Sequence, residues 1–182
     1  MTATDHPTEQ LAALEHGGAT TETALALFDA LPPVRAEEIT GRWRGRELGT
    51  GHPMDGKLTA SGWYGKQFDG PESVHPLLFS TPNGKIFAVD PRKIPLGLTD
   101  KIPVRAVDAG QKLLGVAEPA LRTSKPRARL RNLEYRGKVG AAMVYDQLPI
   151  IDMFRRVDDT TLLGVMDQRG VEQPYFFILT QE

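Results

Sequence analysis

Alternating hydrophobic and polar residues in the second half of the chain predict a series of short β-strands. Two runs, residues 127–135 and 139–145, are joined by a short polar turn, and residues 153–157 and 161–166 form a second pair. A last run, residues 175–179, is rich in the aromatic and β-branched residues that favour strands. Successive short antiparallel strands favour a closed or nearly closed barrel, or a sandwich, over a parallel α/β sheet.

Hydrophobic residues near the start of the chain recur at the spacing expected of a helix. Ala24, Leu27, Phe28 and Leu31 recur at helical intervals, which predicts a helix lying on a core from residue 21 onward. Residues 1–20 are expected to form a peripheral N-terminal segment with a first short helix, and residues 21–182 a single globular domain.

The middle of the chain gives mixed signals. Residue types alternate over residues 38–48, which predicts a strand with one buried and one solvent-exposed face. Residues 58–68 are predicted to form a short helix. A hairpin is expected around Asn83-Gly84. Residues 90–126 are interpreted as irregular structure with a strand near Val104. The predicted fold is therefore mainly β (α+β), an antiparallel barrel with an N-terminal helix and one or two short additional helices.

The composition limits the cellular compartments and the classes of binding partner that are expected. The chain has 182 residues, which is enough for one core, and no cysteine, so a reducing, cytoplasmic compartment is expected. No secretory signal or membrane-spanning run is visible, so stable membrane insertion is not expected. A net charge of −1 gives no general attraction to nucleic acid. The oligomeric state stays open, with a homodimer as one alternative.

Several segments resemble a known bacterial family. Gly41-Arg42-Trp43-Arg44-Gly45, followed by Gly62-Trp63-Tyr64-Gly65-Lys66 and His75-Pro76-Leu77, resembles the GXWXG domain over about residues 21–90. Residues 122–180 resemble the domain of unknown function that usually follows it, for example in Met143-Val144-Tyr145-Asp146. The resemblance implies that both parts form one barrel, and it names no activity.

A looser similarity is to lipocalin-like (calycin) barrels. In those proteins a Gly-x-Trp on the first strand plugs one end of the barrel, and Gly41-Arg42-Trp43 after a short helix fits that plan. A small barrel of this type can hold one apolar ligand, oriented by polar groups at its mouth. The candidate ligand-binding residues are Trp43, His52, Trp63, Tyr64, His75, Arg131, Met143, Tyr145, Asp152 and Arg155.

Each candidate also has a purely structural interpretation. The aromatic residues and Met143 can simply fill a solid core. By alternation Arg131 is expected to point inward beside an aromatic side chain, although the basic run around it also fits a solvated edge hairpin. Asp152 can hold a polar ligand or cap a turn, and Arg155 can hold an anionic head group or pair with a neighbouring carboxylate.

The four histidines lack metal-site spacing, so no metal site is predicted. His52 and His75 can be residues of the barrel mouth, general bases or axial haem ligands, but ordinary loop histidines are the simpler interpretation, and no cofactor is expected. Nucleotide-binding loops and a nucleophile elbow are absent from the sequence.

Three functional hypotheses follow, of which the last is a structural or partner-binding module with a filled core and an exposed apolar patch. The first is an intracellular binding protein for a hydrophobic small molecule or lipid with a polar or anionic head, held in a barrel cavity. The alternative is a cofactor-independent enzyme, such as an isomerase, cyclase or hydrolase, that acts on a hydrophobic metabolite in the same pocket. For that enzyme His52, His75, Asp146 and Asp152 are the candidate proton-transfer groups, and no catalytic residue is assigned.

Overall fold

The chain folds around one antiparallel β-sheet. The computed structural model describes residues 6–94 and 101–182. Its strands are β1 (Gly41–Leu48), β2 (Trp63–Phe68), β3 (Val74–Ser80), β4 (Ile86–Ala88), β5 (Ala128–Tyr135), β6 (Lys138–Tyr145), β7 (Ile150–Arg156), β8 (Thr161–Gln168) and β9 (Tyr175–Gln181). Its α-helices are α1 (Pro7–Gly17), α2 (Thr21–Ala30), α3 (Lys57–Ala60), α4 (Val104–Gln111) and α5 (Leu114–Leu121).

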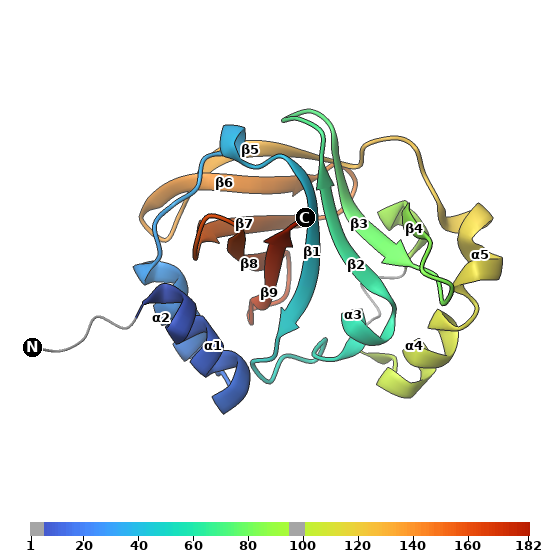
Figure 1. The fold of residues 1–182 in the computed structure, drawn as a ribbon, viewed down its shortest axis with the longest axis horizontal. Coiled ribbons are helices and arrows are strands. Elements are labelled where there is room, and N and C mark those ends of the chain that lie inside the picture. The colour runs from blue at the N-terminus through green and yellow to red at the C-terminus, as the bar shows by residue number, and fades with distance from the viewer. Residues whose placement is uncertain (1–5, 95–100) are drawn as a thin grey trace, which may run out of the picture.

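Eight of these strands close into a barrel (Figure 1). The strand order is β2-β1-β9-β8-β7-β6-β5-β3, and an antiparallel pairing of β2 with β3 completes the ring. The short strand β4 pairs with β3 outside the ring, as the second half of the predicted hairpin. The seam between β3 and β5 is short, with Val74 opposite Ala128. The predicted mainly β barrel is confirmed.

Strands β8 and β9 are apolar on both faces. On β9 the side chains of Tyr175, Phe177 and Leu179 belong to the core inside the barrel, whereas Phe176 and Ile178 belong to a second cluster on its outer surface. This alternation follows from the two-residue period of a strand. An apolar outer face needs a cover, and the N-terminal helices supply it.

Helices α1 and α2 lie against the outside of the barrel (Figure 1). Ala24, Leu27, Phe28 and Leu31 are all buried in the outer cluster, which confirms the predicted helical stripe. Helix α2 begins with a capping box, because Thr20 accepts a hydrogen bond from the backbone N–H of Thr23 and the Thr23 side chain accepts one from the backbone N–H of Thr20.

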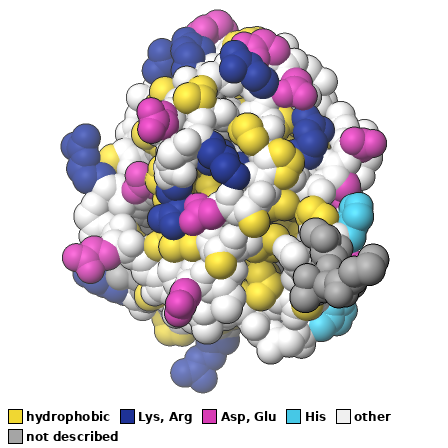
Figure 2. Space-filling model, turned by 90° about the vertical axis from the view of Figure 1, so that its left-hand side faces the viewer, with side chains coloured by type: hydrophobic (Ala, Val, Ile, Leu, Met, Phe, Trp, Pro, Cys, Tyr) yellow, Lys and Arg dark blue, Asp and Glu magenta, His cyan; other side chains and the backbone are white. Residues whose placement is uncertain are grey.

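Helix α1 packs on α2 and buries Leu11. Salt bridges also join the helices to the barrel: Arg46 binds Glu15 at 2.6 Å, and Arg136 binds Asp29 at 2.6 Å. Figure 2 shows this side of the molecule, where positive and negative side chains lie next to each other and hydrophobic side chains are visible between them. Residues 1–5 of the predicted N-terminal segment lie outside the described residues.

The prediction of a helix over residues 58–68 is wrong. Helix α3 is only one turn long, and the chain then turns at Gly62 into strand β2. Hydrogen bonding to β1 and β3 on both sides stabilises the strand, so tertiary pairing overrides the local pattern.

The prediction for residues 90–126 is also wrong where it can be compared. The segment contains helices α4 and α5, and Val104 begins a helix rather than lying in a strand; residues 95–100 lie outside the described part. The described chain therefore has more helices than predicted. None of these helices is long and apolar enough to cross a membrane.

Two glycines make room for aromatic rings inside the barrel. A Cβ atom at Gly45 would overlap the indole ring of Trp63, and one at Gly164 would overlap the ring of Phe177. The two rings pack edge to face, with centroids 6.0 Å apart. Glycine at these positions is therefore a packing requirement.

Replacing Gly45 with alanine should destabilise the protein. The added methyl group forces the ring of Trp63 to move, and overpacking of this kind costs about 1–3 kcal/mol. Urea denaturation of the variant measures the change in the free energy of unfolding. Gly115→Ala is the matched control, because a Cβ there meets nothing within 4 Å and alanine favours the helix; equal losses in the two variants would contradict the explanation.

Candidate functional site

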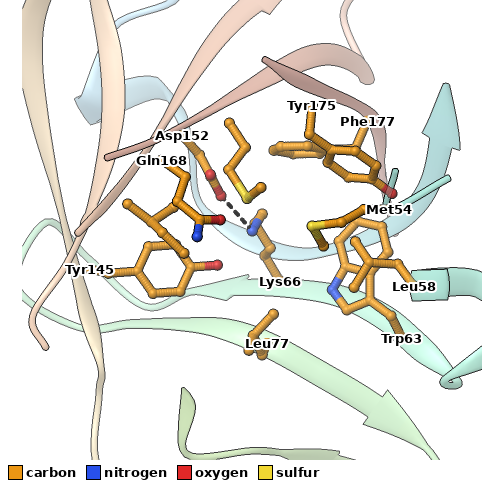
Figure 3. A pocket seen from close by; sticks show the side chains of 12 residues that line it. Met54, Leu58, Trp63, Lys66, Leu77, Tyr145, Asp152, Gln168, Tyr175 and Phe177 are labelled. Atoms are coloured by element: carbon orange, nitrogen blue, oxygen red, sulfur yellow. Dashed lines mark hydrogen bonds and ion pairs between the residues drawn. The ribbon is translucent and has the colours of Figure 1, made fainter. Parts of the chain in front are cut away.

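A small cavity of about 30 Å³ lies inside the barrel at the end where α3 packs. Figure 3 shows the side chains around it. We call this space the inner cavity; its lining residues are Met54, Leu58, Trp63, Lys66, Leu77, Tyr145, Ile150, Asp152, Met166, Gln168, Tyr175 and Phe177. The barrel interior is otherwise filled by side chains. It therefore has room for a small polar group but not for a long ligand.

A buried ion pair crosses this space. Lys66 Nζ on β2 lies 2.8 Å from Asp152 Oδ2 on β7, and both side chains are almost completely buried. Because β2 and β7 are four strands apart in either direction around the ring, the pair joins opposite walls of the barrel. Lys66 also donates a hydrogen bond to the carbonyl oxygen of Pro76 at 3.2 Å.

Aromatic rings surround the ammonium group of Lys66. Its Nζ atom lies 4.9 Å from the ring centroid of Phe177 and 5.8 Å from those of Trp63 and Tyr145. The faces of aromatic rings attract cations, and this attraction is larger in a desolvated site. The rings therefore offset part of the cost of burying the charge.

Asp152 and Tyr145 present polar atoms to the cavity. Within residues 6–94 and 101–182, Asp152 Oδ1 is buried and has no hydrogen-bond partner. Burial raises the pKa of Asp152, and the neighbouring Lys66 ammonium opposes that rise. Burial also raises the pKa of the Tyr145 hydroxyl well above its ordinary value, so this group is a neutral phenol at physiological pH. Figure 3 shows the Tyr145 hydroxyl directed toward the Lys66–Asp152 pair.

An irregularity in β2 makes this arrangement possible. In a regular strand Trp63 and Lys66, three residues apart, would point to opposite faces. The register with β3 shifts on both sides of Gly65, so β2 contains a bulge there. Gly65 has φ +151°, and a Cβ on it would overlap the backbone of Trp43. The bulge turns both Trp63 and Lys66 toward the interior.

A larger apolar space lies next to the inner cavity, where α3, α4 and α5 pack against β3. Its volume is about 280 Å³. We call it the outer pocket; its lining residues are Met54, Lys57, Leu58, Ser61, Leu77, Phe79, Ile94, Ile102, Val107, Gly110, Gln111, Leu114, Ala117 and Leu121. Met54, Leu58 and Leu77 line both spaces and so form the wall between them.

The structure brings three of the predicted site residues together: Trp63, Tyr145 and Asp152 all line the inner cavity. Trp43 and Met143 are buried in the same core, where they fill space without lining the cavity. The indole N–H of Trp43 donates to the carbonyl oxygen of Thr40 at 3.0 Å.

Of the two predicted histidines, His52 lies in the loop after β1 and His75 on β3, and neither belongs to either lining. His52 packs against Tyr175 at 5.3 Å between ring centroids, and its Nδ1 accepts the backbone N–H of Met54. Burial lowers the pKa of both His52 and His75. The described residues contain no group of three or more His, Asp or Glu side chains placed to hold a metal ion.

Tyr64 and Arg131 lie outside the barrel. The guanidinium groups of Arg42 and Arg44 lie over the ring of Tyr64. The Tyr64 hydroxyl donates a hydrogen bond to the Glu182 carboxylate. Arg131, expected to point inward, is partly exposed and pairs with Glu72 at 2.6 Å. Leu130 is the inward-facing residue of this part of β5, so the prediction that Arg131 points inward is wrong: the face that it shares with Arg129 is the outer one.

Arg155 is buried, but on the opposite face of β7 from Asp152. Its guanidinium carbon lies 4.6 Å from the ring centroid of Phe28 in α2, and Nη2 donates to the carbonyl oxygen of Tyr135 at 2.9 Å. Arg155 therefore holds the helical layer on the barrel, and it cannot reach a ligand in the inner cavity.

Sequence reasoning missed Lys66, the cation of the site. Lys66 belongs to the family-like segment Gly62-Trp63-Tyr64-Gly65-Lys66. Because residues 58–68 were predicted to form a helix, no buried position and no ion-pair partner were predicted for Lys66. Its neighbours Gly65 and Gln67 give no sign in the sequence that the side chain is buried. The contribution of Met54 and Leu58, which lie in a loop and a one-turn helix, had no sequence signal either.

Breaking the buried ion pair should destabilise the protein strongly. Lys66→Met leaves the Asp152 carboxylate without its partner, and losses of about 3–5 kcal/mol are typical of such changes. The double variant Lys66→Met, Asp152→Leu should recover most of this loss. Urea denaturation checks both values. Arg131→Met, which breaks an exposed pair, is the control and should cost less than about 1 kcal/mol; a double variant no more stable than Lys66→Met would contradict this account.

Stability should fall in acid partly because of His52. Since burial lowers its folded pKa below the unfolded value of about 6.5, the unfolded chain binds more protons, and stability is lost as the pH falls below that value. His52→Gln should therefore reduce the difference in unfolding free energy between pH 7 and pH 5. A difference that His52→Gln leaves as large as in the wild type would contradict this explanation.

Comparisons with known proteins agree with this architecture. The family model described as GXWXG protein matches residues 26–84, and that of a domain of unknown function, DUF4334, matches residues 126–181. A crystal structure of a protein from Thermomonospora curvata is similar, with 32% identity, a TM-score of 0.71 and coverage of 97% of this chain and 98% of that one. No curated protein matches. The chain belongs to the GXWXG family, with DUF4334 as its C-terminal part.

Proposed function

We propose that the protein binds a hydrophobic small molecule or lipid that carries a polar head. The observation that supports this most directly is the position of the outer pocket, whose wall of Met54, Leu58 and Leu77 separates it from the Lys66–Asp152 pair. An apolar tail would lie in the outer pocket, and its head would reach the inner cavity.

The size and lining of the outer pocket fit a short apolar chain. A volume of about 280 Å³ is at the lower end of the range for small-molecule sites, which are mostly apolar with a few polar groups. Burial of the ligand's apolar surface contributes roughly 25 cal/mol per Å². Affinity would therefore come mainly from the tail, and orientation from the head.

Entry of the head requires the wall to open. Met54 and Leu58 come from a loop and a one-turn helix whose backbone is held by several hydrogen bonds, so opening falls to the side chains. Methionine is unbranched and adapts its shape to what it packs against. Rotation of these side chains would join the two spaces without a change in the strands.

The enzymatic alternative has less support. Of the four candidate proton-transfer groups, His52, His75 and Asp146 lie outside both linings, and Asp146 pairs with Arg129 on the surface. Asp152 remains, but Lys66 holds one of its oxygens. An enzyme of this kind needs proton-transfer groups beside its substrate, whereas a binding protein needs only the polar atoms that line the inner cavity.

Filling the outer pocket should abolish binding. Ala117→Trp places an indole in the pocket, so the affinity for an uncharged solvatochromic dye such as Nile red should fall at least about tenfold, measured by fluorescence titration. Ala120→Trp, on the exposed face of the same helix, is the matched control and should bind as the wild type does. Organic extracts and native mass spectra of gently purified protein should show a bound apolar compound. Failure of the wild type to bind the dye, together with no extracted compound, would refute the proposal.

A further inference from the structure

We infer that the inner cavity selects an uncharged, hydroxyl-bearing head group and rejects a carboxylate. This inference rests on the proposed function, because it assumes that the head of a bound molecule reaches the Lys66–Asp152 pair. Charge, hydrogen bonding and size each support it, and an experiment can separate its failure from that of the proposed function.

The first argument is charge balance. Lys66 and Asp152 are the charged residues among those lining the inner cavity, and they neutralise each other at 2.8 Å. A carboxylate brought to this site would add an unbalanced negative charge to a buried, aromatic-walled space, and an unpaired buried charge is costly. An uncharged head leaves the balance unchanged. A free lysine would attract an anion, but Lys66 is already paired.

The second argument is hydrogen bonding. Asp152 Oδ1, buried at the cavity wall, accepts no hydrogen bond from any described residue, so it offers an acceptor to a ligand that carries a donor. The Tyr145 hydroxyl and the Gln168 side-chain amide also line the cavity, and both can donate. A hydroxyl group donates and accepts at once, so it can satisfy both kinds of partner. A carboxylate only accepts and leaves Asp152 Oδ1 unsatisfied.

The third argument is size. A volume of about 30 Å³ is larger than the roughly 10–15 Å³ that a cavity needs to hold one water molecule, so a small polar group fits. A hydroxyl group is comparable to water in size and offers the same donor and acceptor, so it can replace water there without loss of hydrogen bonds. Size therefore admits a hydroxyl head, and the discrimination against a carboxylate comes from charge and hydrogen bonding.

A series of ligands with one tail and different heads tests the inference on the wild-type protein. Decanol, decanoate and decylamine compete with Nile red at pH 8, where the second is an anion and the third a cation. Decanol should bind at least about tenfold more tightly than either. Equal or tighter binding of decanoate would overturn the inference, whether its anion goes to Lys66 or to Lys57, a charged residue among those that line the outer pocket.

A charge variant gives an independent test. Asp152→Asn leaves the Lys66 ammonium uncompensated, so the ratio of the decanol to the decanoate affinity should fall at least about tenfold, in favour of decanoate. Asp146→Asn is the matched control, because Asp146 pairs with Arg129 on the surface, and it should leave the ratio unchanged. An unchanged ratio in a folded Asp152→Asn variant would overturn the inference.

The outcomes for the two proposals differ. If none of the three ligands competes with the dye and the dye itself does not bind, the proposed function fails, and this inference with it. If all three bind with similar affinity, binding stands and head-group selection is refuted. If Asp152→Asn does not fold, judged by circular dichroism, the wild-type series alone decides.

Discussion

The ion pair between Lys66 and Asp152 is the constraint on which the interior of this barrel depends. It joins strands on opposite walls, so it fixes how β2 and β7 face each other across the core. Two charges taken out of water carry a large desolvation cost, which is offset only by good geometry and additional partners. Here the partners are the carbonyl oxygen of Pro76 and three aromatic rings. A core built around such a pair cannot be uniformly apolar, and the inner cavity lies beside it.

The glycines that shape the barrel also shape this site. Gly45 and Gly164 admit the rings of Trp63 and Phe177, and the same two rings line the inner cavity and face the Lys66 ammonium. Gly65 permits the bulge that turns Lys66 inward. Packing and site chemistry therefore rest on the same few residues, so a substitution that disturbs one is expected to disturb the other.

The helices divide into two groups with different roles. Helices α1 and α2 cover the apolar outer face of the barrel (Figure 1), where Arg155 stacks on Phe28. Helices α3, α4 and α5 lie at another part of the barrel and leave the outer pocket between themselves and β3. Burial of apolar side chains against the barrel stabilises the first group. The second group leaves apolar surface uncovered, which is what a ligand site requires.

The sequence by itself determined the antiparallel strands, the hairpins, the stripe of α2 and the family, because these depend on local periodicity, turn residues and recognisable motifs. It also singled out Trp63, Tyr145 and Asp152. It did not determine the strand β2, which neighbouring strands stabilise, or the helices α4 and α5, whose pattern is short and interrupted by glycine and proline. Only the tertiary structure showed that Lys66 faces Asp152, because 86 residues separate them and a bulge reverses the alternation that places Lys66. Register and closure are long-range properties, so the chemistry of the site was decided by the fold.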